Sequence, residues 1–122
     1  MSKTKLLFIC TYNVSRSRTA EDLFVNSVEY EAKSAGFIYH SRGKKMVNQE
    51  LVDWADKIIV MNESEMSDDR PPCRHASQLR TNFNLTGKEV FILGISDIYE
   101  KNDPRLVSLL GDRLRDIVGI IM

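Results

Sequence analysis

The sequence predicts a three-layer α/β fold, with a four-stranded parallel sheet between helices on both faces. Short continuous apolar runs, typical of strands that are buried on both faces, recur along the chain. Between them lie segments whose apolar residues recur at helical spacing. This alternation favours parallel strands joined by right-handed crossovers. We find no repeat and no second domain, and we expect residues 1–122 to form one domain.

The first half of the chain is predicted to supply two strands and two helices. Residues 5–10, KLLFIC, form the first apolar run, and residues 30–36, YEAKSAG, can hold a short second strand. Residues 17–30 are expected to be helical, and Asn48 can cap a second helix that runs through residue 56. The apolar residues expected on the inner faces of these helices are Ala20, Leu23, Phe24 and Val28 in the first, and Leu51, Val52 and Ala55 in the second.

The second half completes the sheet and adds a last helix. Residues 57–61, KIIVM, and residues 89–95, EVFILGI, are predicted as the third and fourth buried strands. Asp103 followed by Pro104 is typical of a helix start, because aspartate caps well and proline fits the first helical position. Residues 62–88 are the least regular part, where we expect one or two helices and a surface loop.

Composition excludes several classes of protein. The 17 basic and 17 acidic residues give a formal net charge of zero, which predicts no binding to nucleic acid or to a membrane surface. No apolar run approaches the roughly 20 residues of a membrane helix, and the N-terminus lacks the features of a signal peptide, so we expect the cytoplasm. Cys10 and Cys73 are too few for a disulfide framework, and with His40 and His75 they lack the spacing of a metal site.

The turn after the first strand is the strongest candidate site. Ligands of parallel sheets bind at the carboxyl ends of the strands, and a helix that starts there favours an anion and a thiolate. Cys10 stands at such an end, and Arg16 adds a planar charged fork suited to phosphate oxygens. Ser17 can hydrogen-bond the thiolate. The predicted phosphate cradle consists of Thr11, Tyr12, Asn13, Val14, Ser15, Arg16 and Ser17.

A cysteine aimed at phosphorus needs an acid that protonates the leaving group. Asp97 follows the fourth predicted strand and therefore lies at the same edge of the sheet. Asp103 is the competitor, although it also suits the role of helix cap. Tyr12 and Tyr99 could line a slot for an aromatic substrate group. The alternative interpretation of Cys10 is a buried apolar residue at a strand end.

At these residues the sequence resembles the low-molecular-weight protein tyrosine phosphatase family. That family opens with a strand that ends in Cys-x5-Arg-Ser and is followed by a helix, as in LLFICTYNVSRSRTAE. The segments KSAG, WADKIIVM and ISDIYEKNDPRLVSLL also look like family segments, the last like a small bacterial branch of predicted tyrosine phosphatases. The resemblance implies a phosphotyrosine protein phosphatase I-like fold with strand order 2-1-3-4.

The resemblance also implies roles for individual residues. Cys10 resembles the nucleophile that forms a phosphocysteine, and Arg16 resembles the arginine that binds the phosphoryl oxygens. Asn13 and Ser17 resemble the residues that hold the loop and the thiolate. Asp97 resembles the general acid, which would act as base toward water in the second step. No metal and no organic cofactor is implied.

Two other functions stay open. A thiol-dependent arsenate reductase shares the Cys-x5-Arg loop but passes oxidation through further cysteines, of which only Cys73 is present. A catalytically weak phosphate-binding module would suit Tyr12 in the cradle, although binding alone needs no thiolate. We therefore predict a cysteine-dependent phosphomonoester hydrolase. Its expected substrate is a phosphotyrosine protein or peptide, or a small phosphomonoester, and phosphate or another oxyanion is expected to occupy the loop.

Overall fold

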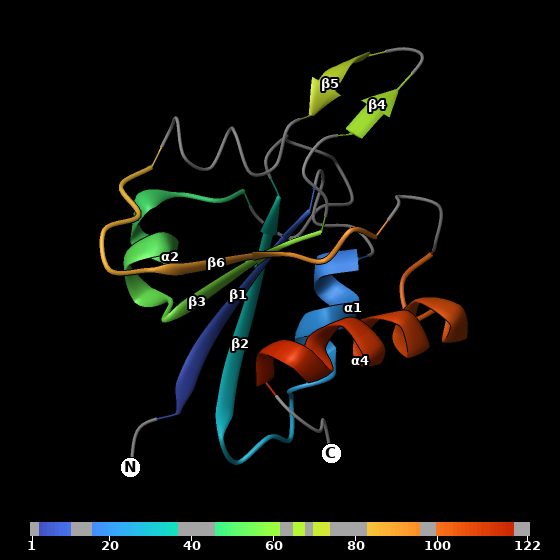
Figure 1. Cartoon of the computed structure of the whole chain (residues 1–122), viewed down its shortest axis with the longest axis horizontal. Helices are drawn as coiled ribbons and strands as arrows, with labels where there is room; N and C mark the ends of the chain where they lie inside the picture. Colours follow the sequence, from blue (N-terminus) through green and yellow to red (C-terminus); the bar gives the residue numbers. More distant parts are fainter. Residues whose placement is uncertain are drawn as a thin grey trace.

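The computed structural model describes residues 3–10, 16–36, 46–61, 65–67, 70–73, 83–95 and 100–118 (Figure 1). The strands are β1 (Thr4–Cys10), β2 (Tyr30–Gly36), β3 (Lys57–Val60), β4 (Glu65–Ser67), β5 (Arg70–Cys73) and β6 (Glu89–Ile92). The helices are α1 (Arg16–Asp22), α2 (Gln49–Trp54) and α4 (Pro104–Val118).

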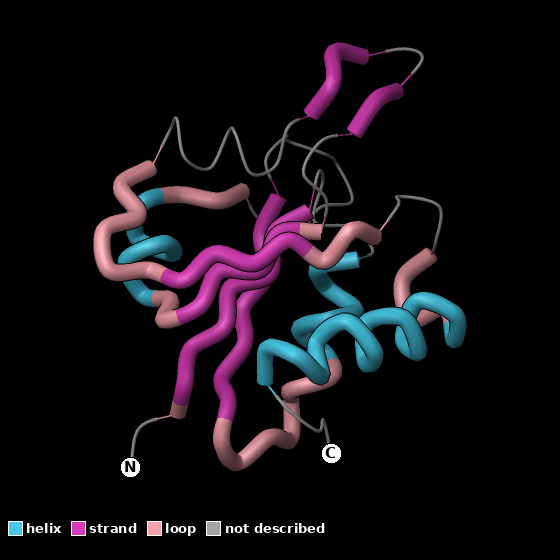
Figure 2. The backbone as a smooth tube through the Cα atoms, in the orientation of Figure 1, coloured by secondary structure: helices cyan, strands magenta, loops and turns pink. Residues whose placement is uncertain are grey.

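The main sheet has four strands, which lie side by side in Figure 2 in the order β2-β1-β3-β6. All of its neighbouring strands are parallel. Counting these strands along the chain gives the order 2-1-3-4, so the predicted sheet is confirmed. The register pairs Cys10 with Gly36, Ile9 with Val60, and Val60 with Ile92. The carboxyl ends of the four strands therefore lie together at one edge, and Cys10 is part of that edge.

Two apolar cores lie on opposite faces of this sheet. Leu6, Phe8 and Cys10 of β1 belong to the core beneath α1 and α4 (Figure 1). Leu7 and Ile9 belong to the core beneath α2. Because successive side chains of a strand point to opposite faces, a strand covered on both faces needs apolar residues at every position. This requirement explains the continuous run from which β1 could be predicted.

The first helix is shorter than predicted. It ends at Asp22, and the chain then makes tight turns before β2 begins at Tyr30. Phe24 still enters the core, where its ring stacks on that of Phe8 with centroids 5.7 Å apart. Val28 was expected on the inner face, but it is 85% exposed, so that prediction is wrong. The chain must reverse here to start a parallel strand, and a helix continued to residue 30 would prevent the reversal.

The starts of the two later helices agree with the prediction. The Asn48 side chain accepts a hydrogen bond from the Leu51 N–H at 2.8 Å, which caps α2. The Asp103 side chain accepts one from the Arg105 N–H at 2.9 Å, and Pro104 is the first residue of α4. These caps satisfy N–H groups that a helix start leaves without intrahelical partners.

The fourth strand of the sheet, β6, ends earlier than the predicted range of 89–95. Gly94 has a φ of 72°, a conformation that interrupts an extended strand and that glycine adopts at little cost. Ile95 nevertheless stays attached to the sheet, because its N–H donates to the Met61 carbonyl at 2.7 Å. Ile95 is also fully buried, so the chain leaves β6 along a defined path at the carboxyl edge.

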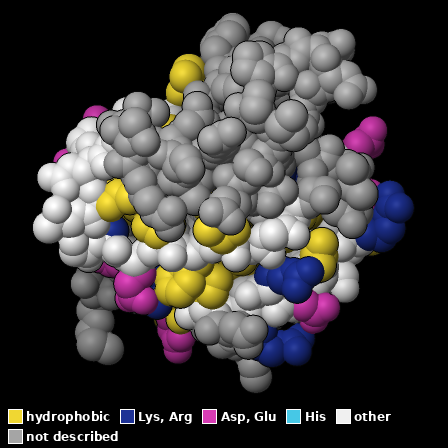
Figure 3. Space-filling view, turned by 45° about the horizontal axis from the view of Figure 1, so that its top comes forward, with side chains coloured by type: hydrophobic (Ala, Val, Ile, Leu, Met, Phe, Trp, Pro, Cys, Tyr) yellow, Lys and Arg dark blue, Asp and Glu magenta, His cyan; other side chains and the backbone are white. Residues whose placement is uncertain are grey.

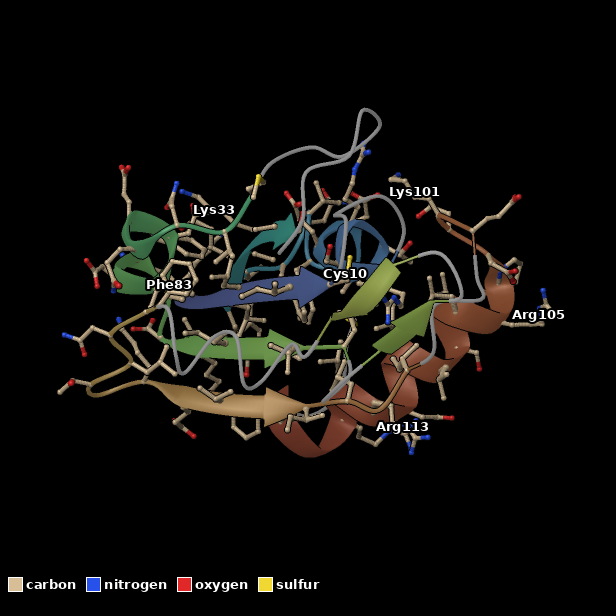
Figure 4. The ribbon with its side chains drawn as sticks, turned by 90° about the horizontal axis from the view of Figure 1, so that it is seen from above. Cys10, Lys33, Phe83, Lys101, Arg105 and Arg113 are labelled. Atoms are coloured by element: carbon tan, nitrogen blue, oxygen red, sulfur yellow. The ribbon has the colours of Figure 1, made fainter. Side chains whose placement is uncertain are left out.

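Residues 62–88 are described only in part, since residues 62–64, 68–69 and 74–82 lie outside the described residues, and the prediction of one or two helices among them stays a prediction. Their described part contains β4 and β5, a short antiparallel pair that lies beyond the carboxyl ends of the strands of the main sheet (Figures 1 and 4). Two prolines, Pro71 and Pro72, fall within β5. Proline removes a helical hydrogen bond, whereas it is tolerated in an edge strand, and both strands of a two-stranded ribbon are edges.

The described surface carries both signs of charge. Lys and Arg side chains and Asp and Glu side chains are interspersed in the view of Figure 3. This agrees with the formal net charge of zero. Among the helices that the structure describes, none combines the length and the apolar character that would be needed to span a bilayer.

Candidate active site

Cys10 is the last residue of β1, at the tip of the strand arrow in Figure 4. Its side chain is buried on the face that α1 covers. The second residue of α1, Ser17, meets it there, with 3.0 Å between Cys10 Sγ and Ser17 Oγ. Ser17 is fully buried. The pleat of β1 and the packing of α1 thus bring a thiol and a hydroxyl together at the carboxyl edge of the sheet.

Arg16 starts α1 and is only 1% exposed. Its Nη1 donates a hydrogen bond of 2.8 Å to the carbonyl oxygen of Ile95, the buried residue beyond β6. Burying a guanidinium is costly unless polar groups surround it, and the Ile95 carbonyl is one such polar partner. The structure therefore brings two residues of the predicted site, Cys10 and Ser17, into contact, and Arg16 is the chain neighbour of Ser17 at the start of α1.

The other predicted site residues lie outside the described part of the chain. They are Thr11, Tyr12, Asn13, Val14 and Ser15 of the predicted cradle, and Asp97 and Tyr99 of the predicted acid loop. Their roles stay predictions. The described residues on either side of these two segments are Cys10 and Arg16 for the first, and Ile95 and Glu100 for the second.

A row of side chains along α1 contacts the residues that flank the predicted acid loop. Besides Arg16, which bonds Ile95, the buried Thr19 accepts a hydrogen bond at 2.9 Å from the Asn102 N–H to its Oγ1. Lys101 Nζ lies 2.9 Å from an oxygen of the Asp22 carboxylate. Sequence reasoning missed these partners. The spacing 16, 19, 22 indicates a common helix face, but it does not show what that face contacts.

The competing acid, Asp103, is already engaged. Besides capping α4, its carboxylate pairs with the Arg105 guanidinium at 3.0 Å. Hydrogen bonds from the side chain and the backbone of Arg105 hold the pKa of Asp103 below its usual value. A lowered pKa disfavours the protonated form that a general acid must supply. The geometry therefore favours a capping role for Asp103.

The residues described by the structure include no group of three His, Cys, Asp or Glu side chains that could hold a metal ion. What the described site offers is a thiol, a hydroxyl and a buried guanidinium at one edge of a parallel sheet. A thiolate is a strong nucleophile, and a guanidinium can bind two oxygens of a tetrahedral anion at once. This donor set suits an oxyanion and attack on its central atom.

Comparison with known proteins identifies the fold. A scan against protein-family models gives no match, and a comparison with curated proteins gives none either. Solved structures match over most of the chain. The YwlE arginine phosphatase from Geobacillus stearothermophilus is 21% identical, with a TM-score of 0.63 over 93% of this chain and 91% of its own. A low molecular weight protein tyrosine phosphatase from T. tengcongensis is 18% identical, with a TM-score of 0.62 over 93% of this chain and 99% of its own.

A third solved structure on the same fold has a different activity. It is a thioredoxin-dependent arsenate reductase from Corynebacterium glutamicum, 18% identical, with a TM-score of 0.62 over 94% of this chain and 60% of its own. The chain therefore has the fold of the low-molecular-weight protein tyrosine phosphatases, and the resemblance noted in the sequence is confirmed for the fold. Because these proteins carry out different reactions, the choice among activities depends on the site.

Proposed function

We propose that this protein is a cysteine-dependent phosphatase that hydrolyses phosphomonoesters through a phosphocysteine on Cys10. One observation carries the proposal: the Cys10 thiol lies 3.0 Å from the Ser17 hydroxyl, and the preceding residue, Arg16, is buried at the same edge. A hydroxyl at that distance can donate to a thiolate and stabilise it. Structural matches that are phosphatases support the same reading.

The proposed reaction has two steps. The Cys10 thiolate attacks phosphorus, the P–O bond to the leaving group breaks, and Asp97 gives its proton to the departing oxygen. The ionised Asp97 then accepts a proton from water while that water attacks the phosphocysteine. The S–P bond breaks, which releases inorganic phosphate and regenerates the thiolate. Arg16 and the loop 11–15 would bind the equatorial phosphoryl oxygens in both steps.

We propose phosphotyrosine as the substrate, in a protein or a peptide. The solved structures of this fold include an arginine phosphatase as well as a tyrosine phosphatase, so the substrate is a separate question from the reaction. The test compares kcat/KM for two peptides of the same sequence, one with phosphotyrosine and one with phosphoarginine at the same position. A higher kcat/KM for the phosphotyrosine peptide supports our assignment, and the reverse order overturns it.

The first experiment is hydrolysis of para-nitrophenyl phosphate by the wild type and by Cys10→Ser, with a reductant and a metal chelator present. We expect turnover to disappear in Cys10→Ser while binding of inorganic phosphate is retained, because the cradle stays intact. Cys73→Ser is the matched control and should keep wild-type turnover. Activity that survives in Cys10→Ser would remove Cys10 as the nucleophile.

Arsenate reduction is a second candidate because a reductase shares the fold. It would show as consumption of a thiol donor that depends on arsenate, on Cys10 and on Cys73. A protein that binds phosphate but neither hydrolyses para-nitrophenyl phosphate nor reduces arsenate would be a binding module.

A further inference from the structure

We infer that Thr19 is a positioning residue. It places the acid-bearing segment, residues 96–99 with the proposed acid Asp97, relative to Cys10 by holding the chain that follows this segment. The inference rests on the proposed function and adds a residue outside the Cys-x5-Arg-Ser motif. Thr19 lies on α1, and α1 begins with Arg16 directly after the predicted cradle. Its Oγ1 accepts the Asn102 N–H at 2.9 Å, five residues beyond Asp97 in the chain.

The two ends of the acid-bearing segment are attached to one face of one helix. Arg16 bonds the carbonyl of Ile95, which precedes residues 96–99, and Thr19 bonds the N–H of Asn102, which follows them. Arg16 and Thr19 are three positions apart and therefore lie on the same face, about 4.5 Å apart along the helix axis. The helix that leads out of the cradle thus fixes where the acid-bearing segment leaves the core and where it returns.

The Thr19 contact is the one best suited to this task. Arg16 is already assigned to the phosphoryl oxygens, so a change there would affect both functions. The Lys101–Asp22 pair is substantially exposed, at 34% and 51%, and an exposed ion pair contributes little. Thr19 is 1% exposed, so its loss would leave the Asn102 N–H without this acceptor in a partly buried place.

The backbone of Asn102 supports the same reading. Its φ is 65°, a left-handed conformation that few residues other than glycine adopt and that asparagine tolerates better than most. Among the described residues, Asn102 is the only non-glycine residue with a positive φ. This conformation turns the chain between the acid-bearing segment and α4, and the contact with Thr19 fixes the turn on α1.

The test compares Thr19→Val, which removes the acceptor oxygen at similar volume, with Thr19→Ser, which keeps it. Each variant is assayed with para-nitrophenyl phosphate, whose leaving group needs little protonation, and with phenyl phosphate, whose leaving group needs it. We expect Thr19→Val to lower kcat/KM for phenyl phosphate about tenfold more than for para-nitrophenyl phosphate, a part of what general acid catalysis contributes. Thr19→Ser should restore the wild-type ratio.

Thr86→Val is the matched control. It removes a threonine hydroxyl that donates to Asn84 at 2.7 Å, in the loop before β6 at the opposite edge of the sheet, and it should leave the ratio unchanged. In an Asp97→Asn background, Thr19→Val should not change the ratio further, because the acid is already absent. A purely structural Thr19 would lower kcat/KM equally for both substrates, and that result, or a further change in the Asp97→Asn background, would overturn the inference.

A second pair of variants tests the contact from its other side, should Thr19→Val fail to fold. Asn102→Gly accepts a positive φ freely and keeps the N–H, whereas Asn102→Val resists that conformation. Only Asn102→Val should lower kcat/KM for phenyl phosphate more than for para-nitrophenyl phosphate. An equal ratio of the two kcat/KM values in Asn102→Gly and Asn102→Val would contradict the inference. Loss of the proposed function is distinguishable, because turnover would then be absent in the wild type or would survive in Cys10→Ser.

Discussion

The two short helices that the structure describes, α1 and α2, are both attached to segments that flank β6, but with different consequences. The residues before β6 are attached to α2, and those after β6 are attached to α1. Figure 4 shows the two regions at opposite ends of the molecule, with Phe83 beside α2 and Lys101 on the side of the site. The α2 contacts lie toward the amino edge of the sheet and the α1 contacts at the carboxyl edge, where Cys10 lies.

The contacts of α2 provide hydrogen-bond partners for the end of this helix and for the loop before β6. The Gln49 side chain both accepts from the Asn84 N–H at 2.9 Å and donates to the Asn84 carbonyl at 3.1 Å. Lys88 Nζ donates to the carbonyls of Asp53 and Ala55 at 2.8 and 2.6 Å, where the helix end leaves carbonyls unpaired. The comparison teaches that similar hydrogen bonds can serve stability at one edge of a sheet and, as we propose, catalysis at the other.

The largest expected effect is the loss of kcat/KM on replacing Arg16, which belongs to the α1 region and not to the α2 region. In Arg16→Lys an ammonium cannot bind two oxygens in the fork geometry of a guanidinium, and the hydrogen bond to Ile95 is disturbed. We expect kcat/KM for para-nitrophenyl phosphate to fall about a hundredfold or more, the usual loss when an oxyanion-binding donor is removed. Steady-state kinetics measure it.

The control for this prediction is Arg115→Lys, which makes the same exchange at an exposed position near the end of α4. It should keep wild-type kinetics. If Arg16→Lys stays folded, as judged by thermal unfolding, and retains kcat/KM within about threefold, Arg16 does not bind the transferring group.

The sheet and its edge could be predicted from the sequence because they follow from local patterns. The run LLFIC, residues 6–10, has apolar residues at every position, which favours a strand covered on both faces. The caps at Asn48 and Asp103 are equally local signals, and the structure confirms both predictions. Cys10 and Ser17 come together because a strand end and a helix start are close in the chain.

What could not be predicted depends on contacts between distant segments. Thr19 and Asn102 are 83 positions apart, and the sequence pattern links neither to the other. The positive φ of Asn102 has no signal in the sequence beyond the tolerance of asparagine for it. The end of α1 at Asp22 was missed because apolar spacing through Val28 suggested a longer helix, whereas the return to β2 decides where the helix stops.

A change in the α2 contacts should lower the stability of the protein and leave kcat/KM unchanged, whereas a change at Arg16 should lower kcat/KM. In Gln49→Ala the two hydrogen bonds with Asn84 are lost, and we expect the free energy of unfolding to fall by about 1 kcal/mol, the net contribution typical of such bonds. Urea denaturation measures it. The kcat/KM values for para-nitrophenyl phosphate and phenyl phosphate should stay at their wild-type levels.

Glu50→Ala is the control for Gln49→Ala, because it truncates the next residue of α2, an exposed one. It should destabilise the protein less than Gln49→Ala does. An altered ratio of the two substrates in Gln49→Ala would mean that the amino edge also affects the acid, and the proposed separation of the two regions would be wrong.

The smallest effect is expected at Asp103, which follows the acid-bearing segment but belongs to the start of α4. Because Arg105 lowers its pKa in the folded state, the Asp103 carboxylate stabilises the fold above its unfolded pKa of about 3.9, and this contribution is lost as the pH falls through the folded-state value. Asn is also a good cap, so Asp103→Asn isolates the charge. The urea midpoints of the wild type and Asp103→Asn should differ at pH 7 and converge in strong acid.

Asp112→Asn removes another arginine-paired carboxylate from the exposed surface of α4 and controls for the loss of one surface charge. Asp103→Asn should also leave the ratio of phenyl phosphate to para-nitrophenyl phosphate unchanged, since its carboxylate serves the helix and its lowered pKa disfavours proton donation. A selective loss with phenyl phosphate in Asp103→Asn, absent in Asp97→Asn, would move the general acid from the segment after β6 to the cap of α4. The contact between Thr19 and Asn102 would then position a different carboxylate, one that is adjacent to Asn102 in the chain.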